Sequence, residues 1–223
     1  MYAPRGEEVA AIGGDFLDFC SGPNLQQLAV ALGDVAGKGI EAAAMAVMAK
    51  CALQGIVATL RWPLQPGEAL AEVHHALIAG RLDEGVFVTL AFALLNAKDG
   101  SLTVASAGHP APVLLRADGR VERPLLLSSP AIGVTGEAEL HALPAERLEL
   151  AAGDAALFYT DGFGDARDER GRFYDETRLD EALGELRGLP AAQLAQRLHA
   201  DVRDFAGRPP SDDVALVLLR RTA

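Results

Sequence analysis

The feature of this sequence that most restricts its fold is the division between helical and strand-like hydrophobic patterns. Helical spacing occurs in two pairs of segments, first at 40–60 and 68–82 and later at 176–186 and 191–205. An antiparallel arrangement covered by helix pairs fits this order better than a parallel βαβ sheet. Strands are predicted for the short apolar runs that turn residues separate, at 9–19, 25–34, 86–95, 102–106, 113–116, 147–150, 155–159 and 214–220.

Turn-forming residues mark where the predicted strands reverse. Ser21-Gly22-Pro23-Asn24 lies between the first two runs, and Asp118-Gly119 follows the run at 113–116, so both are expected to close β-hairpins. No repeat, linker or low-complexity stretch interrupts the order of elements. Residues 1–223 are therefore predicted to form a single domain.

The composition limits the partners and the compartment of the chain. Its 20 Lys and Arg against 31 Asp and Glu give a formal net charge of −11. A nucleic-acid surface needs clustered basic residues, so nucleic acid is not expected as a partner. Divalent cations are compatible with this charge, because hard metals prefer carboxylate oxygens. Cys20 and Cys51 fit neither a disulfide framework nor a zinc site, and we interpret both as small buried hydrophobes in a reducing compartment.

The sequence is expected to belong to a cytoplasmic protein. Its first ten residues, MYAPRGEEVA, lack the basic and apolar regions of a signal peptide. The longest Ala-rich stretch runs from Ile40 to Ala49, contains Glu41 and ends at Lys50. It is shorter than the ~20 residues that a membrane-spanning helix needs, so no membrane insertion is expected.

Four aspartates stand where a predicted strand meets a Gly-containing or acidic turn: Asp15, Asp34, Asp161 and Asp212. A carboxylate at the end of a buried strand is costly unless it has a partner. A divalent cation would neutralise several carboxylates at once, and magnesium or manganese accept carboxylate and water oxygens as ligands. The pattern favours a metal site. The alternative, that Asp-Gly pairs are only turns, stays open here because spacing alone does not show that the four side chains converge.

Six segments follow one another in the order typical of a known family. They are GGDFLDF (13–19), GDVAGKGIEAAAMA (33–46), FVTLAFALLN (87–96), SAGHPAPVLL (106–115), FYTDGFGDARDERGRFYDETRL (158–179) and SDDVALVLLR (211–220). Together they extend over essentially the whole chain. The sequence thereby resembles the bacterial serine/threonine phosphatases of the stage II sporulation protein E and RsbU type, a branch of the metal-dependent protein phosphatase 2C-like family.

The resemblance implies a fold and a metal site. The fold would be an α/β (α+β) four-layer sandwich with two central antiparallel β-sheets flanked by helix pairs. Two divalent cations, Mn²⁺ or Mg²⁺, would bind at one end of it. By position, Asp34 would bridge the metals and Val35 would contribute its backbone carbonyl. Asp161 and Asp212 would complete the shell of the first metal, and Asp15 would lie on the side of the second.

Further residues are expected to support the reaction. Asp18 and Asp213 would form hydrogen bonds around the metal ligands. A water that bridges two cations is acidic enough to attack a phosphoryl group directly, so Asp34 and Asp161 would be catalytic as ligands and no Cys or Ser nucleophile is required. His109 stands in the family's Ala-Gly-His-Pro block. It could protonate the leaving serine oxygen or act only as a structural hydrogen-bonding group, and the sequence leaves both roles open.

The resemblance also implies a substrate and partners. The expected activity is hydrolysis of a phosphoserine or phosphothreonine on a small regulatory protein, an anti-sigma-factor antagonist. An upstream sensor domain, an activator and a second copy of the chain are further expected partners. The alternative function is a partner-gated regulatory binding domain with little activity on its own. A metal-dependent phosphatase assay separates the two.

Overall fold

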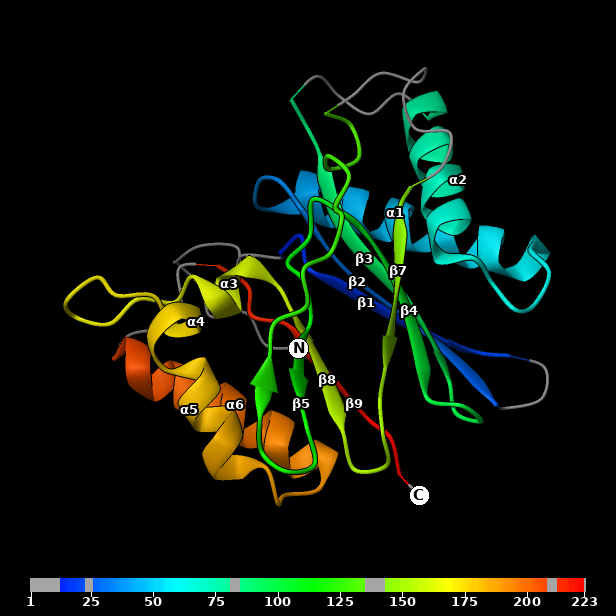
Figure 1. The fold of residues 1–223 in the computed structure, drawn as a ribbon. Helices are drawn as coiled ribbons and strands as arrows, with labels where there is room; N and C mark the ends of the chain where they lie inside the picture. Colours follow the sequence, from blue (N-terminus) through cyan, green and yellow to red (C-terminus); the bar gives the residue numbers. More distant parts are fainter. Residues whose placement is uncertain (1–12, 23–25, 81–84, 135–142, 208–211, 223) are drawn as a thin grey trace, which may run out of the picture.

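Two antiparallel β-sheets lie face to face at the centre of the computed structural model, and helices cover the outer face of each sheet (Figure 1). The structure describes residues 13–22, 26–80, 85–134, 143–207 and 212–222. One sheet has the strand order β1-β2-β3-β4-β7, and the other has the order β6-β5-β8-β9. The four-layer sandwich expected from the sequence is therefore confirmed.

The five-stranded sheet positions two of the predicted site residues. In the β1–β2 pair Phe16 lies opposite Gly33, where a side chain would collide with the Phe16 ring. In the β2–β3 pair Asp34 lies opposite Thr89. The strands of this sheet are β1 (Phe16–Ser21), β2 (Gln27–Val35), β3 (Val88–Asn96), β4 (Ser101–Ala107) and β7 (Ala145–Glu149).

Two long helices, α1 (Ile40–Thr59) and α2 (Pro66–Ala79), cover the outer face of this sheet. Pro66 is the first helical residue of α2, where its missing N–H costs nothing and its fixed φ suits a helix. The buried residues of α1 recur every three or four positions, which produces one apolar stripe against the sheet. These residues are Ala42, Ala46, Ala49, Leu53 and Val57.

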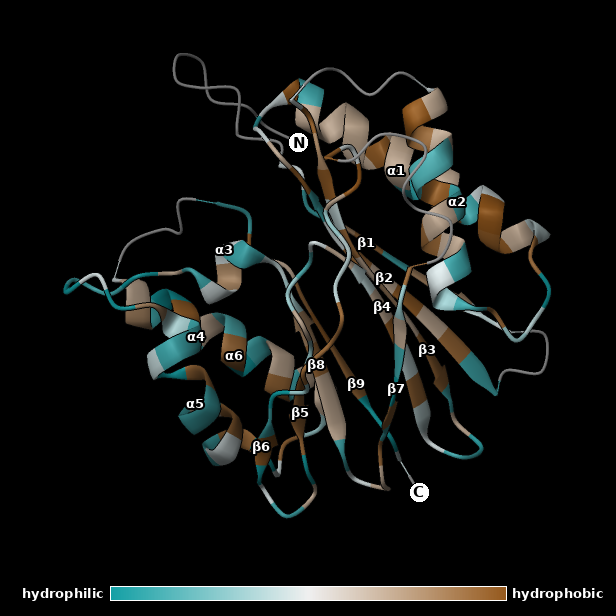
Figure 2. Cartoon of the chain, turned by 45° about the horizontal axis from the view of Figure 1, so that its top comes forward, coloured by the Kyte–Doolittle hydropathy of each residue, from teal (hydrophilic) through white to brown (hydrophobic). Residues whose placement is uncertain are grey.

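The four-stranded sheet consists of β5 (Val113–Leu115), β6 (Val121–Glu122), β8 (Ala155–Tyr159) and β9 (Leu216–Arg220). Its outer face is covered by α5 (Leu179–Leu186) and α6 (Ala191–Ala206). Figure 2 shows polar residues on the outward side of these two helices, whereas α1 is apolar along most of its length. The apolar residues of α6 that face the sheet include Leu194, Leu198 and Val202, which are fully buried.

A third group of apolar side chains fills the space between the sheets. Every residue of β8 is buried, because its two faces contact the facing sheet and the helices. This explains why its sequence is continuously apolar rather than alternating. Phe158 of β8 packs there with residues such as Val30 and Leu32 of β2.

The structure corrects several predicted elements. The helix predicted at 176–186 is divided into α4 (Tyr174–Thr177) and α5, because Arg178 leaves helical geometry (φ −128°) and directs its guanidinium to Asp201 of α6. Asp161 begins a short helix, α3 (Asp161–Gly164), instead of a simple turn. The strand predicted at 9–19 and the turn at 21–24 lie partly outside the described residues.

The helix that contains the Ala-rich stretch Ile40–Ala49 is longer than that stretch. Helix α1 has 20 residues, and by length and composition alone it could cross a membrane, a test that the core helix of a soluble protein also passes. The inner face of α1 packs against the sheet, as that of a core helix does. Its outer side exposes Ile40, Val47 and Met48.

The layer between the sheets should dominate the stability of the domain. We expect Phe158→Ala to lower the free energy of unfolding by about 3–5 kcal/mol, because Phe158 is 1% exposed and its removal leaves a cavity. Phe19→Ala is the matched control, because Phe19 is 49% exposed, and it should cost less than about 1 kcal/mol. Urea unfolding measures both. Equal losses would contradict this assignment of the core.

Candidate functional site

Carboxylates from several elements meet at one end of the sandwich. Asp15 precedes β1, Asp34 lies near the end of β2, Asp161 begins α3, and Asp212 and Asp213 precede β9. The charges of Asp34, Asp161 and Asp213 act on Asp15, and those of Asp161 and Asp212 act on Asp34. The structure thus brings together the four aspartates singled out in the sequence, together with Asp213. We refer to these five residues as the acidic cluster.

Glycines allow the backbone segments of the acidic cluster to approach one another. A β-carbon at Gly14 would lie 2.5 Å from the carbonyl oxygen of Val35 and 2.8 Å from Asp34 Oδ1. Side chains at Gly13 and Gly162 would overlap Asp213. These glycines therefore keep open the space in which the carboxylates and the Val35 carbonyl face one another.

Thr160 holds Asp15 in place from the other sheet. The Thr160 hydroxyl donates to Asp15 Oδ2 at 2.8 Å and accepts from the Ala215 N–H at 3.1 Å. Thr160 is fully buried, so water does not compete for these bonds. The sequence reasoning did not identify Thr160. The sequence feature that could have identified it is a hydroxyl residue at the end of the apolar strand Ala155–Tyr159, directly before Asp161.

The acidic cluster is short of positive charge. Burial, with the nearby charges of Asp34, Asp213 and Asp161, raises the pKa of Asp15 to about 7. Burial and the charges of Asp161 and Asp212 raise the pKa of Asp34 to about 6, and burial also raises that of Asp161. Lys38 forms an ion pair with Asp212 at 3.3 Å, and about half of each side chain is exposed.

The donors of the acidic cluster fit a hard divalent cation that keeps part of its water shell. Carboxylates and a backbone carbonyl are the ligands that Mg²⁺ and Mn²⁺ prefer, and an added cation would lower the raised pKa values. Among the residues that the structure describes, no three His, Cys, Asp or Glu side chains form a group that could hold a metal by themselves. A bound cation would therefore need water or the Val35 carbonyl to complete its coordination.

Asp18 lies apart from the acidic cluster. It is on β1, and its carboxylate pairs with Lys50 of α1 at 3.6 Å. It is not among the charges that shift the pKa of Asp15 or Asp34. The structure therefore gives Asp18 a contact with α1 instead of the metal-supporting contact expected from the sequence.

His109 is buried between the elements that carry Asp34 and Asp161. It is 5% exposed, and its Nδ1 lies 3.0 Å from the hydroxyl of Thr89, the residue opposite Asp34. Burial lowers the pKa of His109 to about 4, against a smaller opposing effect of the Tyr159 backbone. His109 is therefore neutral at pH 7 and joined to β3 by a hydrogen bond.

The raised pKa of Asp15 predicts how the stability of the metal-free protein depends on pH. Asp15 titrates near 3.8 in the unfolded chain and near 7 in the folded one, so its contribution to stability is present below pH 3.8 and is lost as the pH rises to 7. We expect Asp15→Asn to become progressively more stable than the wild type over this range, because Asn stays uncharged. Urea unfolding in EDTA at several pH values measures this, and a constant difference would contradict the assignment.

The hydroxyl of Thr160 should contribute more to the free energy of unfolding than its methyl group does. Thr160→Val leaves the Ala215 N–H and the Asp15 carboxylate without a partner, which should cost about 1–3 kcal/mol of unfolding free energy for each buried group. Thr160→Ser keeps the hydroxyl and should cost about 1 kcal/mol. Urea unfolding at pH 8 in EDTA compares the two. A Val variant as stable as the Ser variant would show that these hydrogen bonds are unimportant.

The sequence and the fold both resemble known bacterial phosphatases. The chain is 24% identical over 208 residues to the phosphoserine phosphatase RsbU of Bacillus subtilis, covering 93% of this chain and 59% of RsbU. The RsbU and RsbW domains of Rv1364c from Mycobacterium tuberculosis match with 27% identity and a TM-score of 0.77, over 98% of this chain and 57% of that one.

Two further structures share the fold. The SiaA-PP2C domain of Pseudomonas aeruginosa is 21% identical with a TM-score of 0.79, over 93% of this chain and 80% of that one. RsbX, solved in complex with magnesium, is 15% identical with a TM-score of 0.64, over 93% and 86% of the two chains. The protein phosphatase 2C-like fold is thereby confirmed.

A family comparison covers five of the six sequence blocks, and the first block, at 13–19, lies outside it. The family model for Stage II sporulation protein E (SpoIIE) matches residues 25–222, which include Asp34, His109, Asp161 and Asp212. The chain belongs to the stage II sporulation protein E family.

Proposed function

We propose that the chain is a metal-dependent serine/threonine protein phosphatase. The observation that carries this proposal is the acidic cluster, in which burial and neighbouring carboxylate charges raise the pKa of Asp15, Asp34 and Asp161 where two cations could bind. The similarity to the phosphoserine phosphatase RsbU supports it. The match covers 59% of the length of RsbU, so the activity of the whole RsbU protein is extended to this chain only as a proposal.

The residues of the acidic cluster would divide the ligand roles between two cations, Mn²⁺ or Mg²⁺. Asp34 would contact both cations, and the Val35 carbonyl would contact one of them. Asp161 and Asp212 would bind the first cation, and Asp15 would lie beside the second. When bound, the cations would supply a water acidic enough for direct attack on phosphorus and would hold the phosphoryl oxygens.

The two cysteines lie outside the acidic cluster. Cys20 lies on β1 beyond Asp18, and burial raises the pKa of its thiol, which lowers its reactivity. Cys51 is exposed on α1 and Cys20 is only half-buried, so the interpretation of both cysteines as buried hydrophobes is wrong for Cys51. Neither cysteine belongs to the acidic cluster, so neither is placed to act there as a nucleophile.

The start of α1 would favour an anionic substrate near the acidic cluster. Helix α1 follows Gly37 and Gly39, which have φ values of 110° and 86°, and its N-cap Gly39 offers no side-chain hydrogen bond. The first N–H groups of a helix have no partner within it, and together with the helix dipole they favour a phosphate. Lys38 adds a positive charge in the same loop.

We infer that His109 positions the site and does not transfer the proton. It is buried, neutral and hydrogen-bonded to Thr89, so its ring is poorly placed to reach a leaving oxygen in solvent. His109→Asn should therefore lower kcat without removing an ionisation from the pH profile of kcat/KM. Loss of an acidic group from that profile would instead support the proton-donor role.

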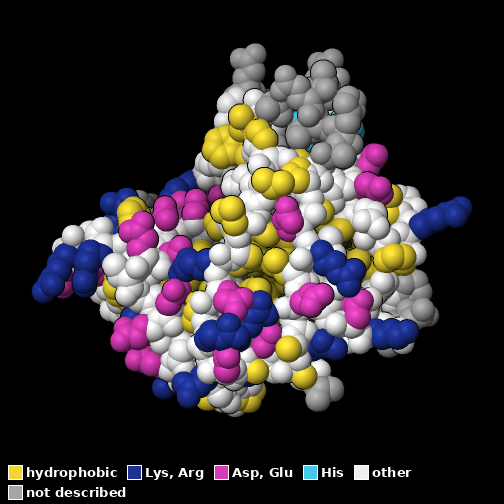
Figure 3. Space-filling model, in the orientation of Figure 1, with side chains coloured by type: hydrophobic (Ala, Val, Ile, Leu, Met, Phe, Trp, Pro, Cys, Tyr) yellow, Lys and Arg dark blue, Asp and Glu magenta, His cyan; other side chains and the backbone are white. Residues whose placement is uncertain are grey.

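The substrate that we propose is a phosphorylated anti-sigma-factor antagonist, a small regulatory phosphoprotein. The face drawn in Figure 3 carries acidic and basic side chains interspersed, which suits a protein partner better than nucleic acid. An upstream sensor domain, an activator and a homodimer are further proposed partners. A cytoplasmic location is part of the same proposal.

The second candidate is a partner-gated binding domain with little activity of its own. The observation that favours it is that no three side chains in the described part of the chain already form a metal-holding group. Under this alternative, the acidic cluster would still bind cations with the help of water, but a partner or activator would have to complete the arrangement needed for turnover before the chain became active.

A phosphatase assay tests both candidates. We expect hydrolysis of para-nitrophenyl phosphate that requires Mn²⁺ and falls by about 100-fold or more in Asp34→Asn and Asp161→Asn, because each loses a ligand charge. Asp99→Asn is the matched control, because Asp99 lies in the β3–β4 turn, and it should keep full activity.

The outcomes separate the candidates. Mn²⁺ binding without turnover, on this ester and on a phosphorylated antagonist protein, would favour the gated binding domain. Absence of Mn²⁺ binding would contradict the assignment of the acidic cluster.

A further inference from the structure

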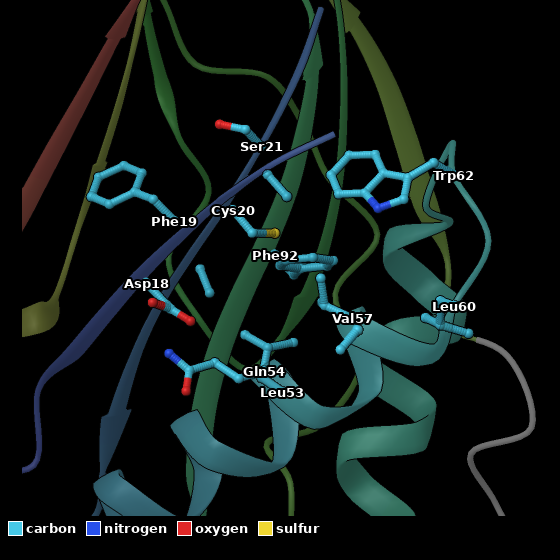
Figure 4. A pocket seen from close by; sticks show the side chains of 13 residues that line it. Asp18, Phe19, Cys20, Ser21, Leu53, Gln54, Val57, Leu60, Trp62 and Phe92 are labelled. Atoms are coloured by element: carbon cyan, nitrogen blue, oxygen red, sulfur yellow. The ribbon is translucent and has the colours of Figure 1, made fainter. Parts of the chain in front are cut away.

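A cavity of about 390 Å³ lies between the second half of α1 and the β1–β2 end of the five-stranded sheet (Figure 4). Its floor is formed by Phe92 and by Ala29 and Ala31 of β2, whose small side chains leave space beneath the helix. The cavity is open to solvent on the side of Phe19 and Gln54, so a ligand could enter it. Its volume falls in the range of roughly 300–1,000 Å³ that is typical of small-molecule sites.

The two ends of the cavity differ in polarity. Figure 4 shows the Asp18 carboxylate beside the Gln54 carboxamide at one end and the Trp62 indole with Leu60 at the other. The Phe92 ring lies between these ends. A molecule that fills the cavity would therefore meet hydrogen-bonding groups at one end and aromatic and aliphatic surface over the rest.

Asp18 gives the polar end its chemical character. Its side chain is 19% exposed, and its contact with Lys50 is long at 3.6 Å, because Lys50 donates its short hydrogen bond to the Leu17 carbonyl at 2.7 Å. Among the residues that the structure describes, none donates a hydrogen bond to the Asp18 carboxylate. A largely buried carboxylate with an unused acceptor favours a ligand that brings a donor.

Asp18 is the charged residue that lines the cavity, and Lys50 is not among the lining residues. The Cys20 sulfur points toward Phe92 (Figure 4), and the pKa of this thiol is raised by burial and then by the charge of Asp18. A carboxylate in the wall next to aromatic faces favours a cation over an anion of similar shape.

We propose that this cavity is a binding site for a small organic amine, with its ammonium group at Asp18 and Gln54 and its apolar body between Phe92 and Trp62. The ammonium group and the apolar body match the two ends of the cavity in polarity. The site is separate from the acidic cluster, and the proposal does not depend on the phosphatase activity.

The sequence offers a direct reporter for this site, because Trp62 is the only tryptophan of the chain. We would titrate the metal-free protein with 2-phenylethylamine and follow the emission of Trp62. The anion 3-phenylpropanoate, which has a similar body, is the matched ligand. We expect a saturable change with the amine and binding at least about tenfold weaker with the carboxylate, which corresponds to about 1.4 kcal/mol.

Two variants test the role of Asp18. Asp18→Asn should weaken binding of 2-phenylethylamine about tenfold, because it removes the charge and keeps the shape. Glu72→Gln, on the exposed side of α2, makes the same change in net charge outside the cavity and should leave binding unchanged. Circular dichroism checks that both variants are folded.

Three results would overturn the proposal. The first is the absence of any saturable change of Trp62 emission with the amine. The second is equal affinity for the amine and the carboxylate. The third is an unchanged affinity in folded Asp18→Asn. Because no metal or phosphate ester is present, none of these results bears on the proposed phosphatase.

Discussion

Burial and mutual repulsion of carboxylates at one end of the sandwich form the constraint on which the rest of the structure depends. Five aspartates from both sheets and their adjoining loops meet there, and burial and the neighbouring charges raise the pKa of Asp15, Asp34 and Asp161. The buried Thr160 hydroxyl and the half-exposed Lys38 are two of the partners of this cluster. Such an arrangement is unfavourable at neutral pH without additional positive charge. It is sustained by the folding energy of the rest of the domain, and bound cations would relieve it.

The two sheets provide that folding energy and set the geometry of the acidic cluster. Asp34 belongs to the five-stranded sheet, whereas Asp161 and Asp212 flank β8 and β9 of the other. Their separation depends on the apolar layer between the sheets, and Thr160 crosses this boundary to hold Asp15. The position of each of these aspartates therefore depends on the packing of both sheets.

Local patterns were sufficient to predict most of the fold. The strand at 155–159 agrees with the structure because a continuous apolar run determines it. The helices beginning at 40 and 191 agree because apolar residues recur at helical spacing over several turns. The break at Arg178 was not predictable, because it depends on Asp201, which lies on another helix. The four aspartates could be singled out from their positions at strand ends. That they converge, that Thr160 joins Asp15 across 145 residues, and that Asp18 turns toward Lys50 depend on tertiary contacts that spacing does not reveal.

The central claim is that the acidic cluster exists to bind divalent cations, and proton release tests it most directly. Asp15 and Asp34 have raised pKa values of about 7 and about 6, so a cation that binds at pH 6 must displace protons from them. Calorimetric titration with Mn²⁺ in buffers of different ionisation enthalpy measures the number of protons released. The account predicts release of about 1.4 protons per protein at pH 6, about 0.9 from Asp15 and about 0.5 from Asp34, which declines toward zero at pH 8 and is reduced in Asp15→Asn. Binding without proton release, or release that is unchanged in Asp15→Asn, would contradict it.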